Sequence, residues 1–389
     1  MMRMALDVDV EVESPQELNH SSYLLAGLFD LEHDGAIAEV RIAPSLNQHR
    51  GDLRVGSDGQ VSSTMARPRK VSHLFIRTAR SRLRLAIDFR DDASVFPENA
   101  LRNSDVVFKR SFDPHIVALI ARRSRARILP AGLSFYVHSP YERGVLALKA
   151  NFAITAMLDA TRIDRGVCHR LRSGWRSVRT ELDHASERQP LTSEIKPIPP
   201  DASRSIVLFQ TRTFNRTDYA DVNVIHAQRA ELIRALRLEF GPQFVGGFVP
   251  DPLSRESFPD CLSSLPGTRA SYYDAMRRAA VVVYSRGLTN SIAWKFSEYL
   301  GLGRCIVAEG IQGTLPAPLT RGMQYEGFDS ASECIAKCRE LLSDPERRFA
   351  MERSARAYYE QWVDPAAGVY RMITSALSGA AAPMPPIKP

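Results

Sequence analysis

The sequence predicts an α/β fold made of two domains, each built around a sheet of parallel strands. The chain has 389 residues, which exceeds one ordinary domain and fits two. Short apolar runs rich in β-branched residues alternate with segments of helical spacing, as in strands joined by crossover helices. Between the two halves, residues 186–203 hold four prolines and little apolar content, which indicates a linker.

The second half contains the clearest strand–helix–strand unit. Residues 279–283 form an apolar run that predicts a buried strand, and residues 305–308 predict the next one. Between them, residues 292–302 carry apolar side chains at helical spacing, with Asn290 or Ser291 as the expected N-cap. A helix that connects two neighbouring strands implies that these strands run parallel.

Two charged residues of this helix lie where such sheets bind ligands. Ligands of open parallel sheets bind outside the carboxyl ends of the strands, near helix N-termini. Lys295 and Glu298 are three residues apart and therefore share one helix face. A lysine next to a carboxylate suits a nucleoside diphosphate. The lysine would bind phosphate, and the carboxylate would accept hydrogen bonds from the ribose hydroxyls. The alternative is a solvated surface ion pair, which is common on helices.

This segment resembles the donor-binding segment of GT-B glycosyltransferases. The resemblance is carried by Gly287, Ser291, Lys295, Glu298, Tyr299, Leu300, Gly303, Ile306 and Val307. It implies that Glu298 binds the donor ribose and that Ser291 and Lys295 belong to the same nucleotide-sugar site. Retaining members of the family usually carry a glutamate in the preceding loop, where this chain has residues 286–290 without one. Whether the configuration of the sugar is kept or inverted therefore stays open.

The first half shows the same alternation of strands and helices. Asp113 and Pro114 mark a helix start, because aspartate is a favoured N-cap and proline is favoured in the first turn. Residues 47–69 are rich in glycine, serine and arginine and predict a mobile loop. The expected strands are residues 4–12, 36–42, 71–76, 83–89 and 105–108 and one opening at 128, and the expected helices are 15–31 and 113–122. Residues 104–140 also resemble the end of the GT-B N-domain.

The start of the second domain offers a second group of cations. Residues 205–210 predict a buried strand, and the loop that follows carries Arg212 and Arg216. GT-B C-domains open with such a strand and a loop whose basic residue meets the donor pyrophosphate, and guanidinium groups bind phosphate in a bidentate manner. Two solvated loop arginines are the alternative.

The expected fold is GT-B: two Rossmann-like domains facing a cleft, with a C-terminal helix that returns to the N-domain. The expected divisions are an N-terminal Rossmann-like acceptor domain (1–140), a helical region with the proline-rich linker (141–204), a Rossmann-like nucleotide-sugar donor domain (205–365), and the end of the crossing helix with a disordered tail (366–389). The closing helices, predicted at residues 332–342 and from 344 to about 362, resemble those of the family in their order after Glu298.

Three residues are candidates for the catalytic base that accepts a proton from an acceptor hydroxyl, and His138 is a weaker fourth. His20 lies early in the first predicted helix, and its imidazole has a suitable pKa. A histidine there resembles the base of some inverting GT-B enzymes. Asp91 and Asp92 follow a predicted strand, and a carboxylate also serves as a base. The sequence does not choose among the three, and each could instead be structural or solvated.

Composition limits the classes of function. A net charge of +7 suits an anionic substrate, an anionic membrane face or nucleic acid. Nucleic acid is not expected, because no base-stacking aromatic run lies among the arginines. The five cysteines form no metal motif, so we expect buried thiols and no metal. No signal-peptide core opens the chain and no run could span a bilayer, so a cytoplasmic protein is expected.

The prediction is a metal-independent glycosyltransferase without a bound cofactor, moving a sugar from a nucleotide-sugar donor to a glycan or lipid-linked acceptor. A sugar-nucleotide epimerase of the same fold and a non-catalytic GT-B-like sugar-binding or scaffold protein are the alternatives. The helical region 141–180 could contact the inner membrane face or be an ordinary solvated surface. Its arginines are Arg162, Arg165, Arg170, Arg172, Arg176 and Arg179.

Overall fold

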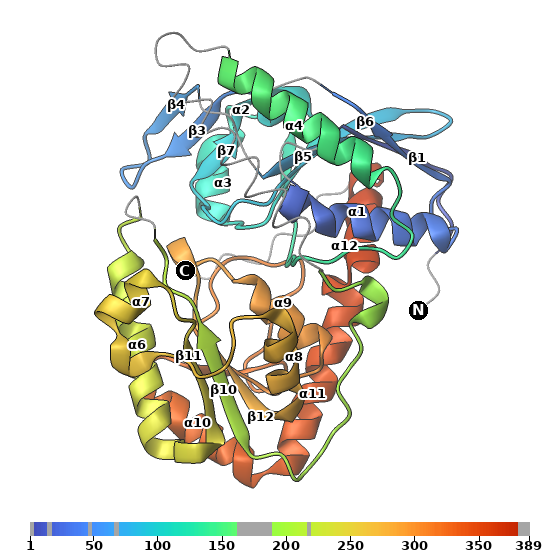
Figure 1. Ribbon diagram of the computed structural model, residues 1–389. Helices are drawn as coiled ribbons and strands as arrows, with labels where there is room; N and C mark the ends of the chain where they lie inside the picture. The colour runs from blue at the N-terminus through green and yellow to red at the C-terminus, as the bar shows by residue number, and fades with distance from the viewer. Residues whose placement is uncertain are drawn as a thin grey trace. The chain divides into compact units, whose positions relative to one another are not determined.

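The computed structural model describes residues 4–13, 18–45, 49–65, 70–161, 189–215 and 219–379. It divides into two compact units, which are described separately. The first unit comprises Met1–Glu194, Thr314–Pro316 and Trp362–Pro389, and the second comprises Ile195–Gly313 and Ala317–Gln361. The predicted two-domain α/β architecture is confirmed (Figure 1).

The first unit is built on a six-stranded sheet in the order β2-β1-β5-β6-β8-β9, with a small three-stranded sheet in the order β4-β3-β7. The strands are β1 (Asp9–Glu13), β2 (Glu39–Ala43), β3 (Asp52–Val55), β4 (Val61–Thr64), β5 (Val71–Arg77), β6 (Arg82–Asp88), β7 (Val95–Pro97), β8 (Val106–Lys109) and β9 (Arg127–Pro130). The helices are α1 (Leu18–His33), α2 (Glu98–Asn103), α3 (Pro114–Ala121), α4 (Val145–Thr161) and α12 (Pro365–Leu377). Asp113 caps α3 as predicted, accepting a hydrogen bond from the amide of His115 at 2.8 Å.

Two expectations for this unit are wrong. Its large sheet is not purely parallel, because β5 runs antiparallel to both β1 and β6. The connection from β5 to β6 is a short hairpin, and strands joined in this way must be antiparallel. Residues 47–69 contain β3 and β4 rather than forming one loop. In β3, which is four residues long, only Leu53 and Val55 are buried, and an alternating pattern this short is a weak signal of a strand.

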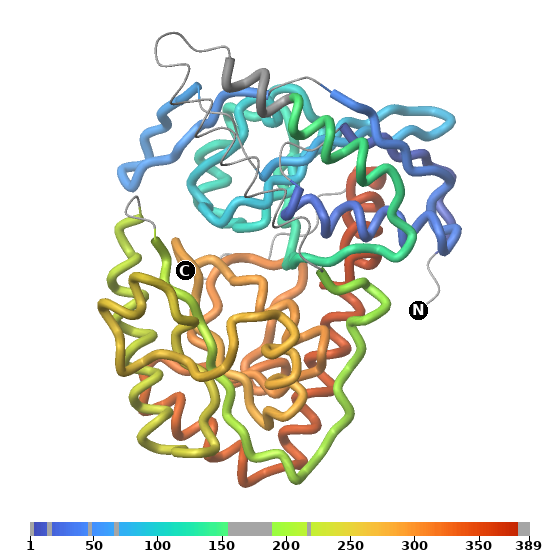
Figure 2. The backbone as a smooth tube through the Cα atoms, in the orientation of Figure 1, coloured from blue at the N-terminus to red at the C-terminus, as the bar shows by residue number. Residues whose placement is uncertain are grey.

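The final helix, α12, belongs to the first unit although it lies at the end of the chain. It packs against α1, which it crosses in the ribbon and in the chain trace (Figures 1 and 2). The hydroxyl of Tyr23 on α1 donates a hydrogen bond of 3.0 Å to the carbonyl of Val363, just before α12. The side chain of Arg127 on β9 bonds the carbonyl of Ala376 at 3.1 Å. The predicted return of the last helix to the N-terminal domain is therefore confirmed.

Gly27 is the point where α1 and the start of α12 come closest. A Cβ atom at this position would lie 2.4 Å from the carbonyl oxygen of Pro365, which is backbone and cannot rotate away. We expect Gly27→Ala to lower the free energy of unfolding by about 1–3 kcal/mol, the usual cost of overpacking. Urea denaturation measures this loss of stability. Gly35→Ala is unsuitable as a control, because residue 35 has a φ of +69°, which alanine rarely adopts. An unchanged urea midpoint for Gly27→Ala would contradict the close contact.

The second unit is built on five strands that all run parallel, in the order β11-β10-β12-β13-β14. The strands are β10 (Ile206–Thr211), β11 (Phe244–Phe248), β12 (Ala279–Tyr284), β13 (Ile306–Glu309) and β14 (Glu326–Phe328). The helices are α6 (Val222–Phe240), α7 (Pro252–Ser257), α8 (Arg269–Arg278), α9 (Trp294–Gly301), α10 (Ala331–Ser343) and α11 (Pro345–Tyr358). The predicted strand–helix–strand unit is confirmed as β12, α9 and β13.

The core of the second unit forms where strand and helix side chains meet. All six residues of β12 are buried, as expected for the central strand of a parallel sheet. Cys261, Cys305, Cys334 and Cys338 are free and buried, which agrees with the expectation of buried thiols. The polar segment 250–268 contains the short helix α7, whose start is capped by Asp251, and is not a loop throughout.

Several expectations fall on residues outside the described ranges. These are Arg216, the six arginines of the helical region and the tail from residue 380 onward. The boundary between the two units lies at Glu194 and Ile195, inside the segment predicted as a linker. Among the helices that the structure describes, none combines the length and the apolar character needed to cross a membrane.

Candidate functional site

The loop between β12 and α9 sits at the carboxyl edge of the parallel sheet of the second unit. It contains a 3₁₀ turn at Leu288–Asn290, in which Thr289 and Asn290 have φ values of +53° and +58°. Helix α9 begins at Trp294 with Ala293 as its N-cap, so the expected cap at Asn290 or Ser291 is wrong. The backbone forms the extra turn first, which delays the helix by one turn.

Ser291 is buried and contributes to the shape of this loop. Its carbonyl accepts hydrogen bonds from the amide of Gly287 at 2.9 Å and from the hydroxyl of Tyr284 at 3.4 Å. The Tyr284 hydroxyl also accepts a bond from the amide of Ala293 at 2.8 Å. A Cβ atom at Gly287 would lie 2.6 Å from the Ser291 hydroxyl, so glycine is needed for this close approach. The loop is therefore held by its own backbone and by one tyrosine.

Lys295 carries its cation to the carboxyl end of β10. Its ammonium group donates a hydrogen bond of 2.5 Å to the carbonyl of Gln210, and it lies 4.4 Å from the ring centre of Tyr272. Burial lowers the pKa of Lys295 to about 7, although the nearby carboxylate of Glu298 opposes this shift. A buried ammonium group binds a phosphate more favourably than a solvated ammonium group does, because less water has to be displaced from it.

Glu298 lies one turn further along α9 and is only 9% exposed. This burial contradicts the alternative of a solvated surface pair. Its carboxylate accepts a hydrogen bond of 2.6 Å from Arg269 on α8, whose guanidinium also reaches the hydroxyl of Tyr273 at 3.2 Å. Burial raises the pKa of Glu298, and the charges of Arg269 and Lys295 offset part of that rise. A carboxylate held in this way has one oxygen fixed by Arg269 and a second oxygen as a further acceptor.

The loop after β10 contains Arg212, whose side chain is exposed. Its charge also lowers the pKa of Lys295, after burial and after the opposing effect of Glu298. Arg212 and Lys295 therefore lie near each other, as expected for two groups that meet one diphosphate. Arg216, the other arginine proposed for this loop, lies outside the described residues.

A buried arginine that the sequence analysis missed joins these two loops. The guanidinium of Arg229 on α6 donates to the carbonyl of Arg212 at 2.7 Å, to that of Arg286 at 2.9 Å and to the hydroxyl of Ser285 at 3.0 Å. Burial lowers its pKa to about 10. Its position gave a usable signal, because Arg229 lies four residues from Ile225 and from Ile233 on the apolar stripe of a helix.

Arg286 stands in the loop where a retaining GT-B enzyme would carry its glutamate. Its side chain bonds Glu309 at 3.1 Å and Asp221 at 3.2 Å, and the carboxylate of Glu309 also accepts a bond from the Arg286 amide at 2.8 Å. These two carboxylates balance the guanidinium. We infer that Arg286 fixes the loop, whereas Lys295 and Arg212 provide positive charge at the sheet edge.

In the first unit, His20 and Asp91 lie close enough to interact. Asp91 follows β6 and accepts hydrogen bonds from Arg110 and, at 3.3 Å, from Lys70. Burial raises its pKa, but the charges of Arg110, Lys70 and His20 hold the pKa of this carboxyl well below its usual range. His20 is buried on α1 and makes an edge-to-face contact of 5.6 Å with the ring of Tyr136.

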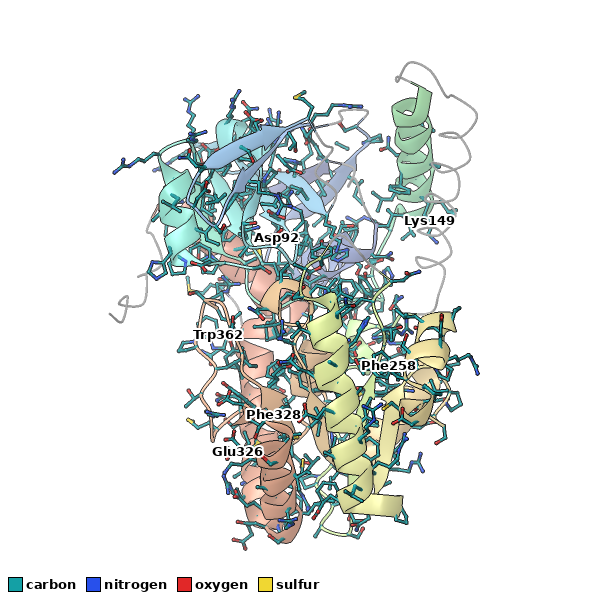
Figure 3. The ribbon with its side chains drawn as sticks, turned by 90° about the vertical axis from the view of Figure 1, so that its left-hand side faces the viewer. Asp92, Lys149, Phe258, Glu326, Phe328 and Trp362 are labelled. Atoms are coloured by element: carbon teal, nitrogen blue, oxygen red, sulfur yellow. The ribbon has the colours of Figure 1, made fainter. Side chains whose placement is uncertain are left out.

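Asp92 has a different environment from its neighbour. One carboxylate oxygen accepts bonds from the amide and hydroxyl of Ser94, at 2.8 and 2.6 Å, and the other from Arg54 at 3.1 Å. Its carbonyl accepts a bond of 3.0 Å from Lys109 (Figure 3 labels Asp92). These bonds shape the turn after β6. Of the three base candidates, the structure brings His20 and Asp91 together and engages Asp92 in the turn.

Neither a family model nor a curated protein sequence matches the chain. Among solved structures, it is similar to glycosyltransferases. One is the C-terminal domain of a glycosyl transferase group 1 family protein, LpcC, from Francisella tularensis, with 12% identity, a TM-score of 0.33, and coverage of 44% of this chain and 97% of that one.

Two further structures cover more of the chain. HepE from Anabaena, solved in complex with UDP, has 12% identity and a TM-score of 0.37, over 71% of this chain and 92% of that one. A putative UDP-N-acetylglucosamine 2-epimerase from Listeria monocytogenes has 12% identity and a TM-score of 0.33, over 74% of this chain and 78% of that one.

Proposed function

We propose that the protein is a glycosyltransferase that moves a sugar from a nucleotide-sugar donor to a hydroxyl of a glycan or lipid-linked acceptor. The observation that carries the proposal is the pair formed by Lys295 and Glu298 on α9. Lys295 is a cation with a pKa lowered to about 7, at the carboxyl edge of a parallel sheet, and Glu298 is a buried carboxylate one turn away. This combination suits a diphosphate and a ribose at neighbouring positions.

In the proposed reaction, the bond between the sugar carbon and the diphosphate oxygen breaks while the acceptor oxygen forms a bond to that carbon. The departing diphosphate gains negative charge, which Lys295 and Arg212 stabilise electrostatically. Positive side chains perform this task in the donor site, so the proposal requires no metal there. Glu298 accepts hydrogen bonds from the ribose hydroxyls, with its carboxylate positioned by Arg269 at 2.6 Å.

The proton of the acceptor hydroxyl passes to a base, for which we propose His20. An efficient base has a pKa near the working pH, and imidazole is the side chain whose ordinary pKa lies nearest to neutral. Asp91 does not, because Arg110 and Lys70 stabilise its ionised form and so weaken it as a base. Its negative charge near His20 instead favours the imidazolium that forms when the proton is taken. Asp91 is thus a positioning residue for His20.

A thermal-shift panel of UDP, GDP, TDP and CMP tests the donor site. A ligand at about 100 times its dissociation constant stabilises by about 2.7 kcal/mol, and one nucleotide should raise the Tm of the wild type. Lys295→Met and Glu298→Gln should each remove most of this shift. Lys337→Met is the control, since this lysine is on α10 and pairs with Glu340. If no nucleotide shifts the wild type, the donor site is wrong and the scaffold alternative is favoured.

Affinity for the donor should also depend on pH through Lys295. The ammonium form binds the diphosphate, and in the free protein it is lost as pH rises through about 7. We therefore expect weaker binding at pH 8 than at pH 6, measured by calorimetry with UDP-glucose, whose diphosphate carries no proton in this range. Lys295→Arg, which stays charged, should show no such dependence. If the affinity of the wild type and that of Lys295→Arg depend equally on pH, Lys295 is not the source of the pH dependence.

The epimerase alternative needs a separate measurement. An epimerase would change the sugar of the donor without an acceptor, whereas a transferase alone would only hydrolyse it slowly to nucleotide and free sugar. Chromatography of the donor after incubation distinguishes these outcomes. We also propose that the protein is cytoplasmic and contacts the membrane peripherally. Flotation with anionic liposomes at two salt concentrations tests the membrane contact.

A further inference from the structure

Three side chains from separate segments of the first unit meet at one end of its large sheet. Glu13 ends β1, His73 lies in β5, and His49 precedes β3. The antiparallel register pairs Val12 with Leu74, so Glu13 and His73 follow as the next opposed pair, and opposed residues project from the same face. The potential ligand atoms of Glu13, His49 and His73 all lie within 4.8 Å of one another.

The contacts within this group leave one histidine unsatisfied. The Nε2 atom of His49 lies 3.0 Å from a carboxylate oxygen of Glu13. The rings of His49 and His73 are 4.2 Å apart between centres. His73 is only 3% exposed, and neither of its ring nitrogens has a hydrogen-bond partner among the described residues. Buried polar atoms are normally satisfied, so this imidazole points to a missing partner.

We propose that Glu13, His49 and His73 form a binding site for a divalent transition-metal ion, best suited to Zn²⁺. Two imidazoles and one carboxylate are a known zinc ligand set, and they leave a fourth position for water or a substrate oxygen. Zinc bonds of about 2.0–2.2 Å place tetrahedral ligands roughly 3.3 Å apart, so ligand atoms that lie within 4.8 Å of one another have to approach by at most about 1.5 Å. The ion would replace the contact between His49 and Glu13 and provide a partner for His73.

One nearby cation opposes the ion. The guanidinium of Arg84 on β6 lies 3.8 Å from the same carboxylate oxygen of Glu13. Its charge repels a metal ion and competes for the carboxylate. Removing this charge should tighten metal binding, an effect that no purely structural role of the three ligands would produce.

The proposed metal site lies at the same edge of the sheet as the proposed base. Strands β1 and β6 are both antiparallel to β5, so their carboxyl ends lie at the same edge of the sheet. Asp91 follows the carboxyl end of β6, and α1 with His20 follows that of β1. The metal site is nevertheless independent of the nucleotide site and is tested without any nucleotide.

The test is a Zn²⁺ titration of the full chain, freed of metal by a chelator, in competition with a chromogenic zinc indicator. The expected result is one tightly bound Zn²⁺ per chain, and Co²⁺ in its place should give the intense visible absorption of a four-coordinate site. His49→Gln and His73→Gln should each weaken binding at least tenfold, and Arg84→Gln should strengthen it. His115→Gln, an exposed histidine of α3, should leave it unchanged.

Two results would overturn the proposal. One is a wild type that binds no zinc more tightly than free histidine side chains do. The other is binding that His49→Gln and His73→Gln do not weaken relative to His115→Gln. If His73→Gln does not fold by circular dichroism, Glu13→Gln and His49→Gln decide the question, because both of these residues are partly exposed.

Discussion

His20→Asn is expected to lower kcat by about 10²–10⁴-fold, the usual contribution of a positioned general base. Asparagine keeps a polar side chain of similar reach on α1 but cannot accept the proton of an acceptor hydroxyl. The effect should fall on kcat more than on KM for the donor, because His20 belongs to the first unit and Lys295 and Glu298 to the second. The assay is release of nucleotide from the donor that the thermal-shift panel identifies.

His33→Asn is the matched control for this variant. It changes another histidine of the same helix, which is exposed and stacks on Tyr141 at 3.5 Å between ring centres, and it should retain activity. Asp91→Asn should lower kcat less than His20→Asn and shift the acidic limb of the pH–rate profile, since Asp91 acts through His20. If His20→Asn keeps wild-type kcat with an unchanged profile, His20 is not the base.

Asp88→Ala is expected to lower the free energy of unfolding of the first unit by about 3–5 kcal/mol, the cost of breaking a buried ion pair. Asp88 is completely buried and accepts bonds from Arg90 at 2.8 and 2.9 Å and from Lys109 at 3.1 Å. Removing the carboxylate leaves Lys109, which is also completely buried, without its counter-charge. Native-state hydrogen exchange of β6 and β8 measures the loss in this unit specifically.

The Asp88 effect should also depend on pH in a defined direction. Burial raises the pKa of Asp88, but Arg90 and Lys109 more than offset this, so the folded-state pKa lies below the usual value. The stabilisation is therefore present above about pH 4 and is lost as pH falls below it. Glu39→Ala, which removes an exposed ion pair with Arg41, should leave the free energy of unfolding almost unchanged. Equal losses for both variants would contradict the role assigned to burial.

The central features of the second unit could be predicted because its local signals agree with its tertiary structure. The apolar runs of β12 and β13 and the apolar face of α9 required burial in a parallel sheet, and the structure has it. The start of α9 was missed, because Asn290 is a good cap by type but its φ of +58° places it in a turn. Backbone geometry of this kind has no signature in residue type alone.

The first unit was harder to predict because its contacts join distant segments. Glu13, His49 and His73 share no motif, and only the register of β1 with β5 and the path before β3 bring them together. The expectation of no metal was based on the absence of short-range Cys and His motifs, and such a search is blind to a site of this kind. Similarly, Asp91 and Asp92 are neighbours in sequence, yet Arg110 and Ser94 give them different environments.

The return of α12 to α1 also bears on how the chain can fold as it is synthesised. The partner of the Tyr23 hydroxyl is the carbonyl of Val363, 340 residues later. A nascent chain therefore holds α1 with an uncovered face until α12 has left the ribosome. The second unit, by contrast, is complete in sequence by Gln361. The first unit thus gains its last helix only after the second unit has been synthesised, and until then the face of α1 that α12 covers is open to chaperones or to other chains.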